Sequence, residues 1–313
     1  TPAPSTASLD NAAPIGTTPL AVRLERDMGP VKVATARPRM AIAGYNIGGV
    51  TYAEATGTAN NSLRGGQGSR TTVALRAIGI DEAVLTRIAT AAHNDLVDQL
   101  TAAGFEVIAA SDVAAAAEAD VVKLGGSAYE GSIDLGRGEK TVLVAGPQDV
   151  GVRALRPIAK VQFGLGNTAK LSEELDAVIV QPNLVLDIVS LEASRARLTG
   201  RSSASATLRF GIEPSSLFAL QATEDGRFSL MSDYRMEGSA SSDAPFGVIG
   251  TAVVEENNLE QGLGLLLGAA TATKKSSASP VGIDVERYEA LALNAARGWN
   301  AAFVAEMRAA RGG

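Results

Sequence analysis

The chain has 313 residues, a formal net charge of −6 and a pI of about 5.1, and only 4% of its residues are aromatic. Hydrophobic residues make up 46% of the sequence, which is enough for a core and excludes collagen-like, coiled-coil and fully disordered chains. The absence of cysteine excludes disulfides, thiol nucleophiles and thiolate metal sites, and a single histidine excludes a two-histidine zinc motif. The acidic pI argues against nucleic-acid binding, which is usually accompanied by a clustered basic face.

Residues 1–30 are predicted to form a flexible leader. The stretch from Thr1 to Leu20 contains four prolines and a single charged residue, Asp10, so it has little apolar surface to bury. Such a leader is typical of a processed, exported chain, and a lipidated cysteine just before Thr1 would be consistent with it. A chain shortened for expression is the alternative interpretation.

The next segments predict a strand, a loop and a helix. The apolar run at 40–45 favours a buried strand, and the Gly-, Asn-, Ser- and Thr-rich residues 54–72 favour a loop. The clearest helix is predicted over 81–103, with Asp81 as its N-cap and Gly104 as its end. Its apolar stripe consists of Val84, Leu85, Ile88, Ala92, Leu96 and Leu100.

Shorter elements follow this helix. A strand at 105–109, an Ala-rich helix over 111–118 and a strand at 119–125 are predicted. Residues 126–176 contain one candidate strand at 141–145 and are interpreted as an elaboration of the domain.

The C-terminal half predicts a run of antiparallel strands and a final helix. Strands are expected at 176–191, 206–212, 217–223 and 227–236, and the last two are joined by a Glu-Asp-Gly turn. A helix is expected over 284–310.

The order of these elements predicts an α/β fold. We expect a mixed β-sheet with packed helices over 81–103 and 284–310 and an antiparallel strand run in the C-terminal half. Residues 31–313 are expected to form a single domain that carries the elaboration at 126–176.

No catalytic, cofactor or metal site is identified in the sequence. A G-x-S-x-G motif is absent, and His93, the only histidine, is interpreted as a packing residue of the helix. Adjacent acidic residues lack the apolar flanks that would raise a pKa for acid–base work, and calcium-loop spacing is absent. We therefore expect no enzymatic activity.

Two glycine-rich segments could hold a phosphate group, at 44–49 and at 164–170. Neither has the spacing of a dinucleotide-binding or P-loop motif, so turns are favoured. The alternative function that they keep open is a periplasmic small-molecule protein or enzyme that binds a nucleotide or a sugar.

The leucine-rich segment 259–273 is the most unusual of the chain, with acidic residues before it and two lysines after it. It could be a buried core helix, a subunit contact or a membrane-touching segment. The predicted partner or membrane contacts are Leu259, Leu263, Leu265, Leu266, Leu267, Lys274 and Lys275.

Three short stretches resemble the curli-secretion lipoproteins (CsgG-like) and the N-terminal domain of TolB. These are the opening strand at 39–46, the helix end and strand at 98–108, and the Ala-Asp-apolar-Gly segment at 119–125. The resemblance implies a periplasmic, outer-membrane-associated fold that binds protein partners, often in rings, without catalysis. The paired amphipathic strands that this family uses at the outer membrane are not identified in the sequence.

Together these features predict an exported, non-enzymatic envelope protein, periplasmic or associated with the outer membrane. It would assemble as a homo-oligomer or bind protein partners of a secretion or surface-structure apparatus. No cofactor, metal or nucleic acid is expected as a ligand.

Overall fold

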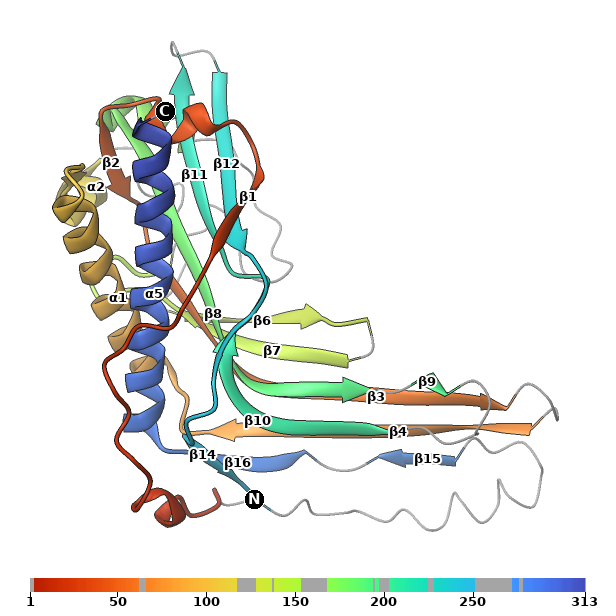
Figure 1. Ribbon diagram of the computed structural model, residues 1–313. Coiled ribbons are helices and arrows are strands. Elements are labelled where there is room, and N and C mark those ends of the chain that lie inside the picture. The colour runs from red at the N-terminus through yellow and green to blue at the C-terminus, as the bar shows by residue number, and fades with distance from the viewer. Residues whose placement is uncertain are drawn as a thin grey trace.

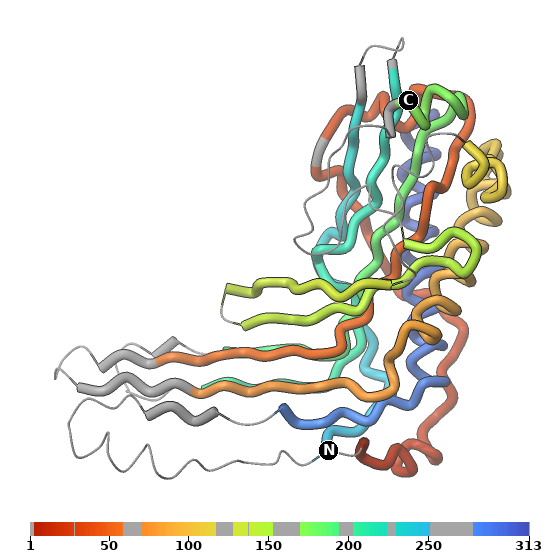
Figure 2. The backbone as a smooth tube through the Cα atoms, turned by 180° about the vertical axis from the view of Figure 1, so that it is seen from behind, coloured from red at the N-terminus to blue at the C-terminus, as the bar shows by residue number. Residues whose placement is uncertain are grey.

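The computed structural model shows a body of helices packed on a mixed β-sheet, from which long strands project (Figure 1). We call the projecting strands the arm; the same strands are seen from behind in Figure 2. The structure describes residues 3–61, 66–116, 128–136, 138–152, 168–193, 195–196, 203–224, 228–250, 272–275 and 278–312.

The elements confirm the predicted α/β fold class, with long helices close to 81–103 and 284–310. The N-terminal half contains η1 (Ala7–Leu9), β1 (Leu24–Met28), η2 (Val31–Thr35), β2 (Arg39–Ile42), β3 (Asn46–Asn61), β4 (Gly66–Ile78), α1 (Glu82–Ala102), β5 (Glu106–Ile108), α2 (Ala110–Ala115), β6 (Ala128–Asp134) and β7 (Gly138–Ala145). The C-terminal half contains α3 (Thr168–Leu175), β8 (Ala177–Ala193), β9 (Arg195–Ala196), β10 (Ala204–Ile212), β11 (Leu217–Glu224), β12 (Phe228–Met236), β13 (Ala240–Ser242), β14 (Gly247–Ile249), β15 (Ala272–Lys275), β16 (Ser279–Ile283) and α5 (Val285–Gly312).

The long strand β8 is the centre of the sheet. The strand order is β1-β12-β11-β8-β3-β4-β16-β14. β8 runs parallel to β2 and then to β3, and on its other side it pairs antiparallel with β11 and then with β10. The predicted antiparallel run of the C-terminal half is therefore the sequence of pairs β10–β8, β8–β11 and β11–β12. The predicted strand at 119–125 lies outside the described residues.

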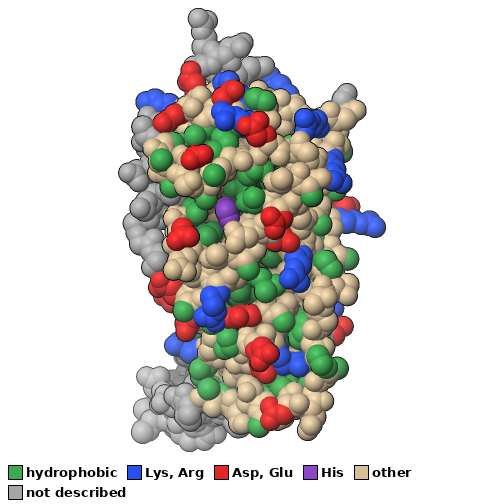
Figure 3. Space-filling model, turned by 90° about the vertical axis from the view of Figure 1, so that its left-hand side faces the viewer, with side chains coloured by type: hydrophobic (Ala, Val, Ile, Leu, Met, Phe, Trp, Pro, Cys, Tyr) green, Lys and Arg blue, Asp and Glu red, His purple; other side chains and the backbone are tan. Residues whose placement is uncertain are grey.

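The two long helices lie side by side on one face of the sheet (Figure 1). The Asp81 side chain accepts a hydrogen bond from the Val84 N–H at 2.9 Å, and Gly104 adopts a positive φ of 82° after the helix. These features confirm the predicted start and end of α1, and all six residues of its predicted apolar stripe are buried. Acidic and basic side chains are interspersed over this face of the molecule (Figure 3).

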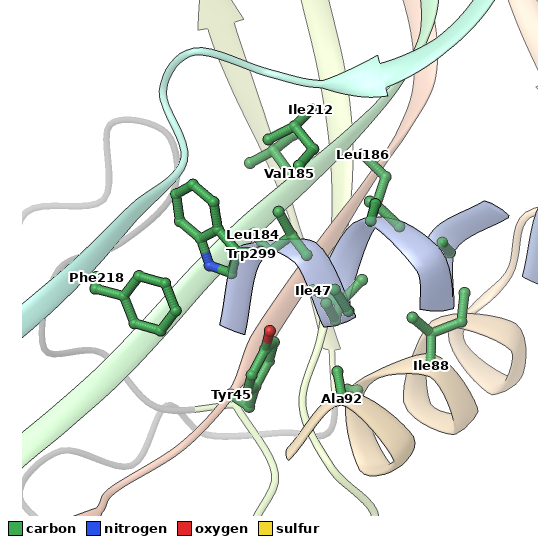
Figure 4. Packing of buried hydrophobic residues seen from close by; sticks show 14 of the residues in the cluster. Tyr45, Ile47, Ile88, Ala92, Leu184, Val185, Leu186, Ile212, Phe218 and Trp299 are labelled. Carbon is green, nitrogen blue, oxygen red and sulfur yellow. The ribbon is translucent and has the colours of Figure 1, made fainter. Parts of the chain in front are cut away.

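Aromatic residues of α5 form the centre of the core. The Phe218 ring of β11 stacks on Trp299 at 4.9 Å and on Phe303 at 4.0 Å, measured between ring centroids. Tyr45, which precedes β3, donates its hydroxyl proton to Oδ1 of Asn300 at 2.8 Å. Figure 4 shows Phe218, Trp299 and Tyr45 grouped where the helices meet the sheet.

Among the described residues, no helix is both long and apolar enough to span a membrane.

The structure differs from the sequence-based expectation for residues 54–72, and the predicted loop is wrong. Residues 54–61 and 66–72 belong to the antiparallel strands β3 and β4, in which Thr56 lies opposite Thr72 with their hydroxyl oxygens 3.0 Å apart. Residues 62–65 lie outside the described residues. β7 pairs with the other edge of β3. Cross-strand hydrogen bonds therefore stabilise strands whose residues have a low intrinsic strand propensity. The structure thus contains long paired strands that the sequence did not reveal.

Residues 20–28, within the predicted leader, are hydrogen-bonded to the body. β1 pairs antiparallel with β12, and the Leu20 N–H donates to the Asn294 carbonyl oxygen of α5 at 2.9 Å. Gly298 lies beneath this segment: a Cβ atom there would be 1.8 Å from the Leu20 carbonyl oxygen. Backbone pairing therefore orders a segment that has few apolar side chains of its own.

This contact predicts the effect of an alanine at Gly298. Gly→Ala within a helix normally stabilises by about 1 kcal/mol, but Gly298→Ala must displace Leu20, so we expect a loss of about 1–3 kcal/mol in urea unfolding. Hydrogen exchange in residues 20–28 should become faster. The matched control is Gly312→Ala in the same helix, where no atom lies within 4 Å of the new Cβ. Equal stabilisation by both changes would contradict the contact.

Candidate functional site at the root of the arm

The structure places only two of the seven predicted contact residues. Lys274 and Lys275 lie in β15, which runs parallel to β4 with Lys274 opposite Thr71. The five predicted leucine contacts, Leu259, Leu263, Leu265, Leu266 and Leu267, lie outside the described residues. The two lysines are therefore located on the arm.

Residues 44–49 are not the loop that the sequence suggested as a phosphate cradle. From Asn46 onward they form the start of β3, between β8 and β7. A Cβ atom at Gly48 would lie 2.7 Å from Val142 Cγ1, and one at Gly49 would lie 3.0 Å from Leu85 Cδ2. These glycines permit close packing within the core, so the turn predicted at these positions is wrong and 46–49 are strand. Of the second segment, 164–167 lie outside the described residues and 168–170 begin α3.

β3 and β8 part at the root of the arm, at a place that we call the fork. They are paired in parallel from Asn46 opposite Asn183 to Gly49 opposite Leu186. Beyond the fork β4 takes the place of β8 beside β3, while β8 continues with β10. β10 then lies against β3, because a Cβ atom at Gly57 would be 2.2 Å from the Ser203 carbonyl oxygen. The arm therefore has two halves, one built on β3, β4 and β7 and the other on β8 and β10.

Three charged side chains meet at the fork, and we call them the fork triad. Lys140 of β7 donates from Nζ to Oδ2 of Asp187 at 2.7 Å and to Oε2 of Glu213 at 2.5 Å. Asp187 is the first residue of β8 beyond its pairing with β3, and Glu213 follows β10. The exposed fractions of the three side chains are only 8%, 15% and 8% in this order. The triad therefore joins the two halves of the arm through a buried ionic contact.

The same residues satisfy backbone groups where the strands separate. Oδ1 of Asp187 accepts from the N–H groups of Ile188 at 2.9 Å and Val189 at 3.3 Å. The Glu213 N–H donates to the Val185 carbonyl oxygen at 2.9 Å. Buried backbone donors that lose a neighbouring strand need such substitutes, because an unpaired buried N–H is costly.

The triad carries one more negative charge than positive charge when all three groups are ionised. Burial raises the pKa of Asp187 to about 6, although the ion pair with Lys140 opposes this shift. Burial lowers the pKa of Lys140, but the two carboxylates outweigh it and raise this pKa above its ordinary value. Tyr288 of α5 is also near: burial, and then the charge of Asp187, raise the pKa of its hydroxyl. Within the described residues this buried hydroxyl has no hydrogen-bond partner.

The chemistry available at the fork is the storage of charge and the binding of protons. The triad contains neither a hydroxyl nor a thiol nucleophile, and His93 lies buried in α1 with Nδ1 3.4 Å from Oδ1 of Asn94. The described ranges contain no cluster of three His, Asp or Glu side chains suited to a metal ion.

None of the three triad residues was predicted from the sequence. Asp187 is a single charge inside an apolar run, Lys140 stands next to Glu139 just before one, and Glu213 directly follows one. An isolated charge in a segment that is otherwise buried is a usable signal, because such a group must find an opposite charge or a proton.

Comparison with known proteins identifies no relative: no family model, curated protein or solved structure matches the chain.

The geometry predicts that Lys140→Met strongly destabilises the protein. This change leaves two buried carboxylates without a counter-charge, and breaking a buried pair in this way costs about 3–5 kcal/mol. Urea unfolding of the variant at pH 7.5 measures the loss. The triple variant Lys140→Met, Asp187→Asn, Glu213→Gln should recover most of it.

An exposed pair provides the control for this experiment. Arg209 and Asp243 are bonded at 3.1 Å with exposed side-chain fractions of 48% and 87%, so Arg209→Met should cost less than about 1 kcal/mol. A loss at Lys140 as small as that at Arg209 would show that the triad is solvated rather than buried.

Proposed function

We propose that this chain is a non-enzymatic envelope protein whose copies associate with one another through the arm. The observation that carries the proposal is the arm itself, since long strands that extend away from a compact body offer surface for a neighbouring chain (Figure 2). The exported location rests on the leader-like composition of residues 1–30 and on the family resemblance of residues 39–46, 98–108 and 119–125.

The strand pairing of the arm supports self-association. Among the described strands, β6 pairs only with β7 and β15 pairs only with β4. The outer edge of a sheet carries N–H and C=O groups that another strand can pair with. β6 and β15 lie toward opposite sides of β3 and β4. A second copy could therefore pair with one side of the arm and leave its own opposite side available to a third copy. Such a head-to-tail contact builds rings when the rotation between copies closes.

The sequence gives the two sides of the arm residues of opposite charge. Glu54 of β3 lies opposite Glu139 of β7, which lies opposite Asp134 of β6, so three carboxylates form one cross-strand row. Like charges directly opposite each other destabilise a sheet. On the other side of the arm, β15 contains Lys274 and Lys275. A neighbouring copy that brings these lysines to the acidic row would relieve the repulsion.

The test measures molar mass by light scattering behind a sizing column, at low and at high salt. We expect an assembly larger than one chain. Reversing the acidic side with Glu130→Lys and Glu139→Lys, both exposed residues, should reduce its mass, as should Lys274→Glu with Lys275→Glu. Mixing the two charge-reversed proteins should restore assembly, because one then has two basic sides and the other two acidic sides, so every contact between them joins opposite charges.

The matched control reverses two exposed acidic residues on the helical face. Asp98→Lys with Asp112→Lys changes the net charge by the same amount, yet both residues lie away from the arm, in α1 and α2, so the mass should not change. A monomer at all concentrations in the unmodified protein would refute self-association. Recovery of the native protein from the cytoplasmic rather than the envelope fraction of cells would refute the location.

A further inference from the structure

The position of the fork triad makes it a joint between the two halves of the arm. Lys140 lies on β7, opposite Ala53 of β3, and belongs to the half built on β3 and β4. Asp187 and Glu213 belong to the half built on β8 and β10. Both ion pairs of Lys140 therefore cross from one half to the other, at the point where β3 and β8 stop pairing.

The charge at this joint is unbalanced by one. The titratable groups that face Asp187 are Lys140 on β7, Glu213 after β10 and Tyr288 on α5. Tyr288 stays neutral at physiological pH because its pKa is raised, so it cannot supply a charge. Lys140 can offset only one of the two carboxylates. A proton on Asp187 brings these groups to neutrality, and burial of its carboxyl group favours that state.

We propose that the fork triad is a proton-operated joint, which takes up one proton between neutral and mildly acidic pH and thereby holds the two halves of the arm together more tightly. With the proton bound, Lys140 and the remaining carboxylate form a neutral pair. Without it, a buried excess negative charge weakens the joint. The proposal does not depend on self-association.

The direction of the pH effect follows from linkage. Burial raises the pKa of Asp187 from the ordinary 3.8 to about 6, so between these values the folded protein binds more protons than the unfolded chain. The stability of the fork should therefore increase as the pH falls from 7.5 to 5. His93 has the opposite sign, because burial lowers its pKa and protonation opposes folding. The two groups can thus be distinguished by the direction of the change alone.

The test is hydrogen exchange of the fork strands at pH 5.0 and 7.5. The rates are corrected for intrinsic exchange, and α5, which lacks His93, is the internal reference. Measurements are made where light scattering gives the same molar mass at both pH values. Relative to α5, we expect residues 138–145 and 186–193 to open more readily at pH 7.5 than at pH 5.0, by a factor of about 10, because only the pH interval below a pKa of about 6 contributes. Equal protection at both pH values would overturn the proposal.

Variants identify the group responsible. Asp187→Asn mimics the protonated side chain, so the fork of this variant should be protected equally at both pH values. Glu213→Gln removes the same excess charge, and it provides a second variant if Asp187→Asn fails to fold. Asp243→Asn, an exposed carboxylate paired with Arg209 of β10, should keep the full pH dependence. The infrared band of protonated carboxylic acids at pH 5.0 should be weaker in Asp187→Asn than in the unmodified protein, by the intensity of about one group. A variant at Asp187 that retains the native pH dependence would refute the joint.

Discussion

Lys140 lies between Asp187 and Glu213 where two parallel strands separate, and the arm depends on this contact. β3 and β8 are paired over four residues, and beyond Leu186 each has a different neighbour. A sheet that divides in this way exposes backbone donors and leaves a gap between its halves. Asp187 fills both needs, because Oδ1 accepts two backbone N–H groups while Oδ2 binds the ammonium of Lys140. An apolar residue at 187 could fill the gap, but it could not accept these hydrogen bonds.

Small residues allow the surrounding elements to approach the fork. Gly49 brings β3 so close to the helices that a Cβ atom there would lie 3.0 Å from Leu85 Cδ2 and 3.2 Å from the Tyr288 hydroxyl. Further out on the arm, Gly57 allows the start of β10 to approach β3, because a Cβ atom at Gly57 would lie 2.2 Å from the Ser203 carbonyl oxygen. Few residues of the chain are aromatic. Those of α5 and β11 are concentrated in the body.

The sequence predicted elements whose signal is local. Helix α1 was identified because its apolar residues recur every three or four positions between Asp81 and Gly104, and the buried stripe matches that pattern. β3 and β4 were missed because threonine, glycine and alanine carry little periodicity, and their stability comes from strands distant in sequence, such as β7. The fork triad was missed for the same reason: Lys140 and Asp187 are 47 residues apart, and only the topology brings them together.

Strand β7 connects the buried charge to the surface. Successive side chains of a strand point to opposite faces, so Lys140 faces the fork while its neighbour Glu139 is exposed in the acidic row. A partner that binds the acidic row also makes Glu139 less free to move, and the backbone between 139 and 140 transmits this restraint to the triad. If copies associate on this side of the arm, the proton at the fork and the partner at the edge act on the same strand. By thermodynamic reciprocity, a proton that tightens the joint would then favour association to the same extent that association favours the proton.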